Sequence, residues 1–130
     1  MKSKLIRISP FIILCIIMAY TWINFLATDY ISTLRHQVAL AFMGINLALY
    51  FVNNKYAIVC TGLILLLATF NLLAFFPVIT SYSYSISFGS KEFYAPAIQP
   101  GSLLLFIFYL IINARYVYRL LPSENQVNKK

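Results

Sequence analysis

The feature that most constrains this chain is a stretch of twenty-one residues, Tyr56 to Phe76, that carries no charged side chain. A helix rises about 1.5 Å per residue, so roughly 20 apolar residues cross a hydrocarbon core about 30 Å thick. A buried helix of a soluble domain is the alternative, but such helices usually show a polar face within roughly 8 to 20 residues. The stretch therefore predicts a membrane span over residues 56–76.

The composition of the whole chain agrees with a membrane protein. Hydrophobic residues make up 62% of the 130 positions and charged residues 10%, whereas soluble domains are about 45 to 50% apolar and about 25% charged. This length predicts one integral membrane domain, with no separate catalytic domain. The net charge of +7 comes from residues at span ends, without the basic face that nucleic-acid binding requires. We expect the lipid bilayer, and no nucleic acid, as a partner.

Residues 8–28 form a second charge-free stretch of twenty-one residues, preceded by three basic side chains. A cleaved signal peptide is the alternative to a retained span. Against it, the apolar region exceeds the roughly 7 to 15 residues of a signal core, and Phe25 is bulky where a cleavage site needs a small residue. Pro10 is expected in the first turns of this helix, where its missing N–H is tolerated.

Two further spans are predicted over residues 33–53 and 101–121. The first of them requires Arg35 and His36 to reach the membrane interface from its first turns. The connection at Asn53 and Asn54 is so short that it makes its two flanking helices antiparallel neighbours, and asparagine suits such a turn because it tolerates left-handed backbone angles. Residues 122–130 form a polar tail.

The segment 78–96 has a different period. Four apolar side chains alternate with serines at every second position, which is typical of a β-strand, and Gly89 with Ser90 provides a turn. We therefore predict a fold of class all-α membrane protein: a four-transmembrane-helix bundle with a short extracytoplasmic β-hairpin between the third and fourth helices. A lone hairpin is marginal in water, so its aromatic face needs the span ends, lipid headgroups or a neighbouring copy to lie on.

The distribution of Lys and Arg predicts the orientation. One side of the membrane would hold eight of them, namely Lys2, Lys4, Arg7, Lys55, Arg115, Arg119, Lys129 and Lys130, and the other side only Arg35 and Lys91. The positive-inside rule then places both termini in the cytoplasm and the hairpin outside. Compactness and this charge bias lead us to expect a bacterial inner membrane.

Apart from Asn53 at the end of its span, each predicted span contains one asparagine, and a buried amide seeks a hydrogen-bond partner. The four are Asn24, Asn46, Asn71 and Asn113. Their depths predict two pairs, with Asn24 and Asn71 near the outer ends of their spans and the other two nearer the middle. They either form hydrogen bonds between helices or line a path for a substrate or ion.

Two helix faces are predicted to take part in packing. In the second span, Gln37, Ala41, Gly44 and Ala48 share one nearly smooth face, which can lie against the third span or against another protomer. In the fourth span, a more polar stripe is expected to face the core. It consists of Ser102, Phe106, Tyr109, Asn113 and Tyr116.

Groups for catalysis are scarce. The acidic residues are Asp29, Glu92 and Glu124, none within a predicted span, whereas proton-coupled transport needs an ionisable group at membrane depth. Cys15 and Cys60 are expected as separate thiols in the inner halves of their spans. The sequence predicts no metal, cofactor or catalytic residue.

One cluster at the outer face could carry chemistry: Asp29, Arg35, His36, Lys91 and Glu92. It would suit a hydrolase or an anion site, or else its members are solvated charges that orient the spans. We expect a non-enzymatic accessory or self-associating membrane component, as an oligomer or with a membrane protein partner. A small carrier or channel for an uncharged or lipid-like solute is the alternative, and an outer-face enzyme is the third.

Overall fold

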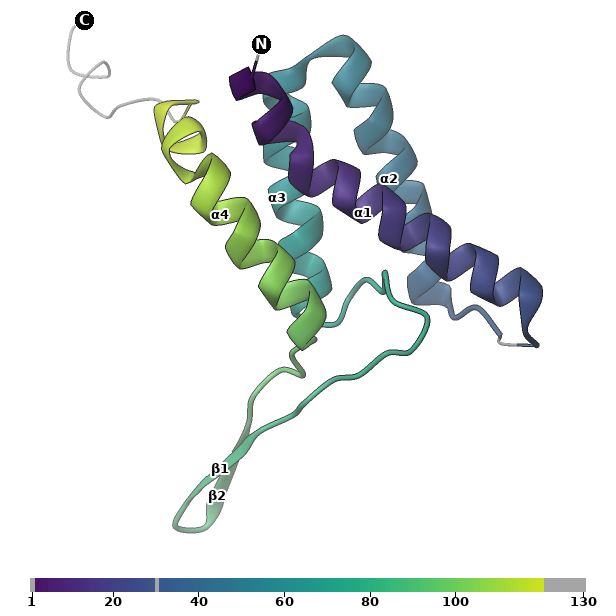
Figure 1. Cartoon of the computed structure of the whole chain (residues 1–130). Helices are drawn as coiled ribbons and strands as arrows, with labels where there is room; N and C mark the ends of the chain where they lie inside the picture. Colours follow the sequence, from purple (N-terminus) through teal and green to yellow (C-terminus); the bar gives the residue numbers. More distant parts are fainter. Residues whose placement is uncertain (1, 30, 121–130) are drawn as a thin grey trace, which may run out of the picture.

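The computed structural model describes residues 2–29 and 31–120, and this part of the chain is mostly helical (Figure 1). It contains four helices and one two-stranded sheet, in the order α1 (Lys2–Ala27), α2 (Leu34–Val52), α3 (Asn54–Thr69), β1 (Ser85–Phe88), β2 (Lys91–Tyr94) and α4 (Pro100–Leu120). Successive helices run in opposite directions, so that the start of α1 and the end of α4 lie at the same end of the molecule. The predicted polar tail, residues 122–130, lies outside the described residues.

The helices differ in their ability to cross a membrane. Within the described residues, two segments are long and apolar enough to do so, Lys4–Ala27 of α1 and Pro100–Leu120 of α4. Helix α3 has 16 residues, which corresponds to about 24 Å of rise. By length and composition alone, the structure therefore supports two membrane-crossing helices rather than the predicted four.

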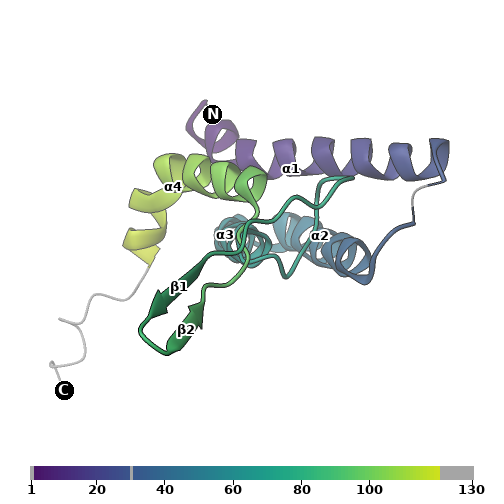
Figure 2. The same cartoon turned by 90° about the horizontal axis from the view of Figure 1, so that it is seen from below.

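Helix α3 lies at the centre of the packing. It contacts α4, α2 and α1, while α1 also contacts α4. Viewed from below, α1 and α4 form one layer and α2 and α3 form the other (Figure 2). The core between them includes the fully buried side chains of Leu14, Ile64, Leu65 and Phe75. Because α3 is in contact with every other helix, it is the element that fixes their arrangement.

The predicted third span over residues 56–76 is wrong in its extent, because α3 ends at Thr69. Asn71 adopts a left-handed backbone angle, with φ at 62°. Its N–H donates to the carbonyl oxygen of Ala68 at 3.0 Å, and the N–H of Leu72 donates to that of Leu67, also at 3.0 Å. These two bonds form a Schellman motif, the hydrogen-bonded turn that ends many helices. Asn71 thus stops the helix within a run that remains apolar.

Beyond this stop the chain continues as an irregular buried segment. Leu73, Ala74 and Phe75 are at most 2% exposed, although residues 70–76 have no helical structure. Irregular backbone at membrane depth is tolerated only where protein surrounds it. Residues 73–75 are therefore enclosed by the helices, whereas Phe70 and Leu72 of the same segment are exposed.

The junction between α2 and α3 consists of one residue. Asn53 is both the C-cap residue of α2 and the N-cap residue of α3. Its side chain accepts a hydrogen bond from the backbone N–H of Lys55 at 3.0 Å. Its φ of −155° is extended, so the left-handed turn expected at Asn53 and Asn54 does not occur. The antiparallel arrangement of α2 and α3 is present, but an extended capping residue produces it.

Pro10 lies inside α1 and not in its first turn, because the helix begins already at Lys2. A proline within a helix deprives the carbonyl four residues earlier of its usual donor. Here that carbonyl belongs to Ile6, and the hydroxyl of Ser9 donates to it at 2.7 Å. The neighbouring serine thereby supplies the bond that the proline cannot make.

The predicted hairpin is confirmed. Strands β1 and β2 are antiparallel, and Ile86 pairs with Phe93 and Phe88 with Lys91. Gly89 has a φ of 62° at the first position of the two-residue turn, as a type II′ hairpin turn requires. The hairpin projects beyond the start of α4 (Figure 1), and every side chain of both strands is exposed.

Candidate functional site

The most polar buried site of the described structure surrounds the irregular segment after α3. Three side chains from distant elements bind its backbone carbonyls. The hydroxyl of Thr21 on α1 donates to the carbonyl oxygen of Phe75 at 2.6 Å. Nε2 of His36 on α2 lies 2.8 Å from that of Phe76, and Nε2 of Gln99 donates to that of Leu73 at 3.0 Å. We call residues 70–76 with these three side chains the loop lock.

His36 is held in one tautomer by its partners. The backbone N–H of Thr33 donates to Nδ1 at 3.3 Å, and the hydroxyl of Thr33 lies 2.8 Å from the same nitrogen. Because the carbonyl of Phe76 only accepts hydrogen bonds, Nε2 carries the proton. The imidazole is 2% exposed, and Phe25 packs edge-on against it at a centroid distance of 4.9 Å. His36 is therefore a structural donor enclosed by protein, not a base open to the outer face.

Gln99 lies immediately before α4, and both the nitrogen and the oxygen of its side-chain amide form hydrogen bonds. Its second Nε2 hydrogen goes to Oδ1 of Asn71 at 2.6 Å, and its Oε1 accepts from the hydroxyl of Ser102 at 3.2 Å. The backbone N–H of Gln99 donates to the carbonyl of Thr69 at 3.0 Å. Thr21 and Gln99 are not among the residues predicted from the sequence, since a single polar residue within or beside an apolar run shows no periodic pattern.

A second polar cluster lies between α2 and α3. Nδ2 of Asn46 donates to Oγ1 of Thr61 at 2.8 Å, and the hydroxyl of Tyr50 lies 3.2 Å from the same oxygen. Thr61 in turn donates to the carbonyl of Ala57 at 2.9 Å. Oδ1 of Asn46 is buried without a partner. Thr61 is thus the centre of this cluster, and Asn46 joins α2 to α3 through it.

The buried side of α4 makes long-range contacts with α3 and α1. Tyr109 donates its hydroxyl to the carbonyl of Ile58 on α3 at 2.9 Å. Nδ2 of Asn113 donates to the carbonyl of Arg7 on α1 at 3.2 Å, and the guanidinium of Arg7 lies 4.4 Å above the ring of Tyr116. The predicted stripe from Ser102 to Tyr116 therefore faces the core.

The four asparagines predicted as two pairs have separate surroundings. Asn24 donates to the carbonyl of Tyr20 in its own helix, and Asn71 lies in the loop lock. Asn46 and Asn113 bind different helices. Within the described residues, each hydrogen bond of these four amides goes to a partner other than an asparagine.

The smooth face of α2 is open. Gln37, Ala41, Gly44 and Ala48 are all exposed, and a Cβ built at Gly44 would meet nothing within 4 Å. The side of α2 that packs inward instead carries His36, Ala39, Met43 and Asn46. Of the two alternatives left by the sequence, this face therefore does not lie against α3.

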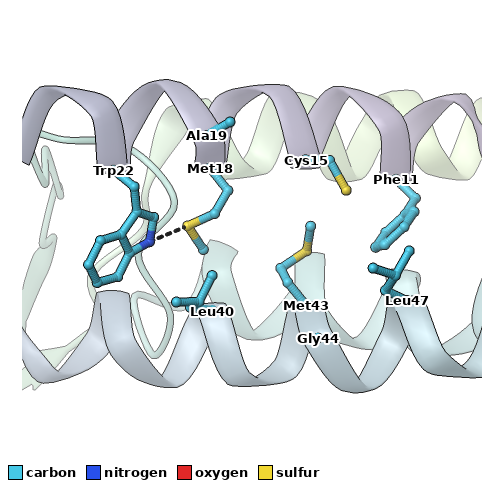
Figure 3. A pocket seen from close by; sticks show the side chains of 9 residues that line it. All are labelled: Phe11, Cys15, Met18, Ala19, Trp22, Leu40, Met43, Gly44 and Leu47. Atoms are coloured by element: carbon cyan, nitrogen blue, oxygen red, sulfur yellow. Dashed lines mark hydrogen bonds between the residues drawn. The ribbon is translucent and has the colours of Figure 1, made fainter.

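An apolar groove lies between α1 and α2, whose ribbons cross in Figure 1. Its central part has a volume of about 470 Å³ and is lined by Phe11, Cys15, Met18, Trp22, Met43 and Gly44, among others. Figure 3 shows these side chains pointing into the space between the two helices. A second cavity of about 530 Å³ shares Phe11 and Cys15 and reaches Ile8 and Asn54. At the other end, Nε1 of Trp22 donates to the sulfur of Met18 at 3.1 Å.

The outer-face cluster is not assembled. Lys91 and Glu92 lie on the hairpin, which projects away from the α1–α2 connection in both views (Figures 1 and 2). Asp29 and Arg35 are exposed at that connection, and His36 is buried in the loop lock. On the hairpin, the hydroxyl of Tyr94 donates to the Glu92 carboxylate, and this bond raises the pKa of Tyr94 above its ordinary value.

The remaining candidate groups are dispersed. Cys15 and Cys60 are free and partly buried. Among residues 2–29 and 31–120, no three His, Cys, Asp or Glu side chains come close enough to hold a metal ion.

Comparison of the chain with protein-family models, with curated proteins and with solved structures finds no match.

Proposed function

We propose that this chain is a small multi-pass membrane protein of the inner, or cell, membrane of a bacterium. In this proposal α1 to α4 all cross the bilayer, and both termini are cytoplasmic. The alternating directions of the helices support it, as does the excess of Lys and Arg at one end. Helix α3 is short, but the buried residues 73–75 follow it within the protein, where irregular backbone is tolerated.

We further propose that the protein is non-enzymatic and associates laterally with a second copy through the smooth face of α2. The observation that carries this proposal is that Ala41, Gly44 and Ala48 are exposed and form a helix surface without bulky side chains. Small residues let helix backbones approach closely, and such contacts drive association where no hydrophobic effect separates helix from lipid. Thr21, His36 and Gln99 use their buried polar groups to bind the protein's own backbone carbonyls, which leaves these groups unsuited to act on a substrate.

The test is the size of the detergent-solubilised protein, measured by light scattering after size-exclusion chromatography. We expect the wild type to be a dimer or larger, and Gly44→Leu and Ala41→Leu to be monomers. Ala114→Leu is the matched control, because it adds the same bulk to an exposed position of α4. A monomeric wild type, or variants that remain associated, would overturn the proposal.

A further inference from the structure

The groove between α1 and α2 has a chemical asymmetry along its length. Its wall on α1 is a single stripe, Ile8, Phe11, Cys15 and Trp22, at spacings that place these residues on one helix face. From Ile8 to Trp22 this stripe measures about 21 Å at the rise of an α-helix. The groove is thus elongated and apolar, and a hydrocarbon chain can lie along it.

Lys4 stands at one end of the groove. It lies four residues before Ile8, so it continues the same stripe, and its side chain is exposed. Arg7, the neighbouring cation, is placed over the ring of Tyr116 instead. The two carboxylates of the described residues, Asp29 and Glu92, lie toward the opposite end of the molecule. An anionic group bound at the Lys4 end would therefore lie near a cation. Neither of the two carboxylates in the described part of the chain would lie close enough to repel it.

We propose that this groove binds one acyl chain of an anionic phospholipid, whose phosphate lies against Lys4. The chain would replace the contacts that α1 and α2 do not make with each other, and within the bilayer its binding would come from close van der Waals packing against the groove. The charge at one end selects an anionic headgroup over a zwitterionic one, because lysines near a membrane surface attract anionic lipids. At the other end, the indole N–H of Trp22 is held by the sulfur of Met18.

Trp22 is the single tryptophan of the chain, so it reports on this groove alone. The full-length protein is reconstituted into phosphatidylcholine vesicles that contain a small fraction of phosphatidylglycerol with brominated acyl chains, which quench tryptophan fluorescence on contact. A parallel sample contains the same fraction of brominated phosphatidylcholine. We expect stronger quenching by the anionic lipid, and equal quenching by the two lipids would overturn the proposal.

Substitution of two lysines at the same end of the molecule distinguishes a specific lipid site from general electrostatic attraction to the membrane surface. Lys4→Gln is expected to lower the preference for the anionic lipid about five-fold, the contribution of one lysine near an anionic surface. Lys55→Gln is the matched control, because Lys55 lines a different cavity, between α3 and α4. An equal loss of preference in both variants would show general electrostatic attraction and overturn the assigned site.

A third variant tests the groove independently of charge. Ala19 lines both cavities, and Ala19→Leu is expected to reduce quenching of Trp22 by either lipid, whereas Ala114→Leu leaves it unchanged. Unchanged quenching in Ala19→Leu would remove the groove from the proposal. The inference depends on the proposed membrane placement but not on self-association, and Gly44 is the residue that the groove shares with the proposed contact face. Monomeric wild-type protein would overturn association only, and equal quenching by the two lipids would overturn the lipid site only.

Discussion

The ring of Tyr109 on α4 lies directly against Gly62 on α3. A Cβ added at residue 62 would stand 2.7 Å from three ring and hydroxyl atoms of Tyr109. The ring cannot easily move aside, because its hydroxyl is bonded to the carbonyl of Ile58 at 2.9 Å. This contact sets how closely the two helices approach.

Gly62→Ala is therefore expected to destabilise the protein by about 1 to 3 kcal/mol, the usual cost of overpacking a core. Gly44→Ala is the control, since a Cβ there meets nothing within 4 Å and alanine favours the helix over glycine by about 1 kcal/mol. Thermal unfolding in detergent measures both variants. A Tm for Gly62→Ala at or above that of Gly44→Ala would contradict the packing described for α3 and α4.

Thr61 is expected to contribute more to stability than Asn46, although both are fully buried. Thr61→Val leaves the amide of Asn46 and the hydroxyl of Tyr50 without their shared partner, at a cost of about 1 to 3 kcal/mol for buried groups left unsatisfied. Asn46→Leu loses one bond but also removes a buried oxygen that has no partner.

The control is Thr69→Val on the same helix, because the hydroxyl of Thr69 binds only the carbonyl of Leu65. Denaturant or thermal unfolding of the three variants should rank Thr61→Val as the least stable. If Asn46→Leu were the least stable of the three, Thr61 would not be the centre of the cluster.

His36 is predicted to hold the loop lock as the Nε2–H tautomer. This tautomer can be observed directly by ¹⁵N NMR of the imidazole. Glutamine places its amide near the position of Nε2 and asparagine near that of Nδ1, so His36→Gln should preserve the bond to Phe76 and His36→Asn should lose it. The backbone amide of Ala74, bonded to the carbonyl of Arg35 at 3.4 Å, should then exchange its hydrogen faster in the asparagine variant. Equal exchange in the two variants would contradict the lock.

The hydrogen bond from Tyr94 to Glu92 predicts a pH effect on the hairpin. The phenol donates to a carboxylate, and loss of its proton would place two negative charges side by side, so the pKa of Tyr94 is raised. Glu92→Gln should lower this pKa toward the ordinary value of tyrosine, whereas Lys91→Gln, on the other face of β2, should change it less. Titration of the tyrosine rings by NMR, with Tyr94 assigned from Tyr94→Phe, measures the shift. A pKa of Tyr94 that is the same with and without Glu92 would exclude this bond.

The hairpin and the helices could be predicted from the sequence because each is a local pattern. The alternation before Gly89 and the charge-free runs depend on neighbouring residues only. The end of α3 was missed because the run to Phe76 stays apolar after the helix stops. A local signal was present in Asn71, since asparagine is one of the few residues that adopts the left-handed angle of a helix stop.

The loop lock could not be predicted, because its bonds join residues far apart in the sequence. Thr21 and Phe75 are separated by 54 positions, and His36 and Phe76 by 40. No period relates such residues, and their contact follows only from the packing of α1 and α2 around α3. For the same reason, the sequence suggested that His36 belongs to an outer charged cluster. In the structure its side chain is buried and donates a hydrogen bond to the carbonyl of Phe76.

If α1 to α4 all cross the membrane, as proposed, the α2–α3 junction lies on the opposite side of the membrane from the hairpin. If only α1 and α4 cross it, the junction and the hairpin lie on the same side. Single cysteines at Lys55→Cys and Ser90→Cys, in a chain with Cys15→Ala and Cys60→Ala, are exposed to a membrane-impermeant maleimide on intact cells. Four crossings predict that Ser90→Cys reacts at once and that Lys55→Cys reacts only after the membrane is permeabilised. Reaction of both cysteines on intact cells would contradict the account, because residue 55 would then lie on the same side as the hairpin.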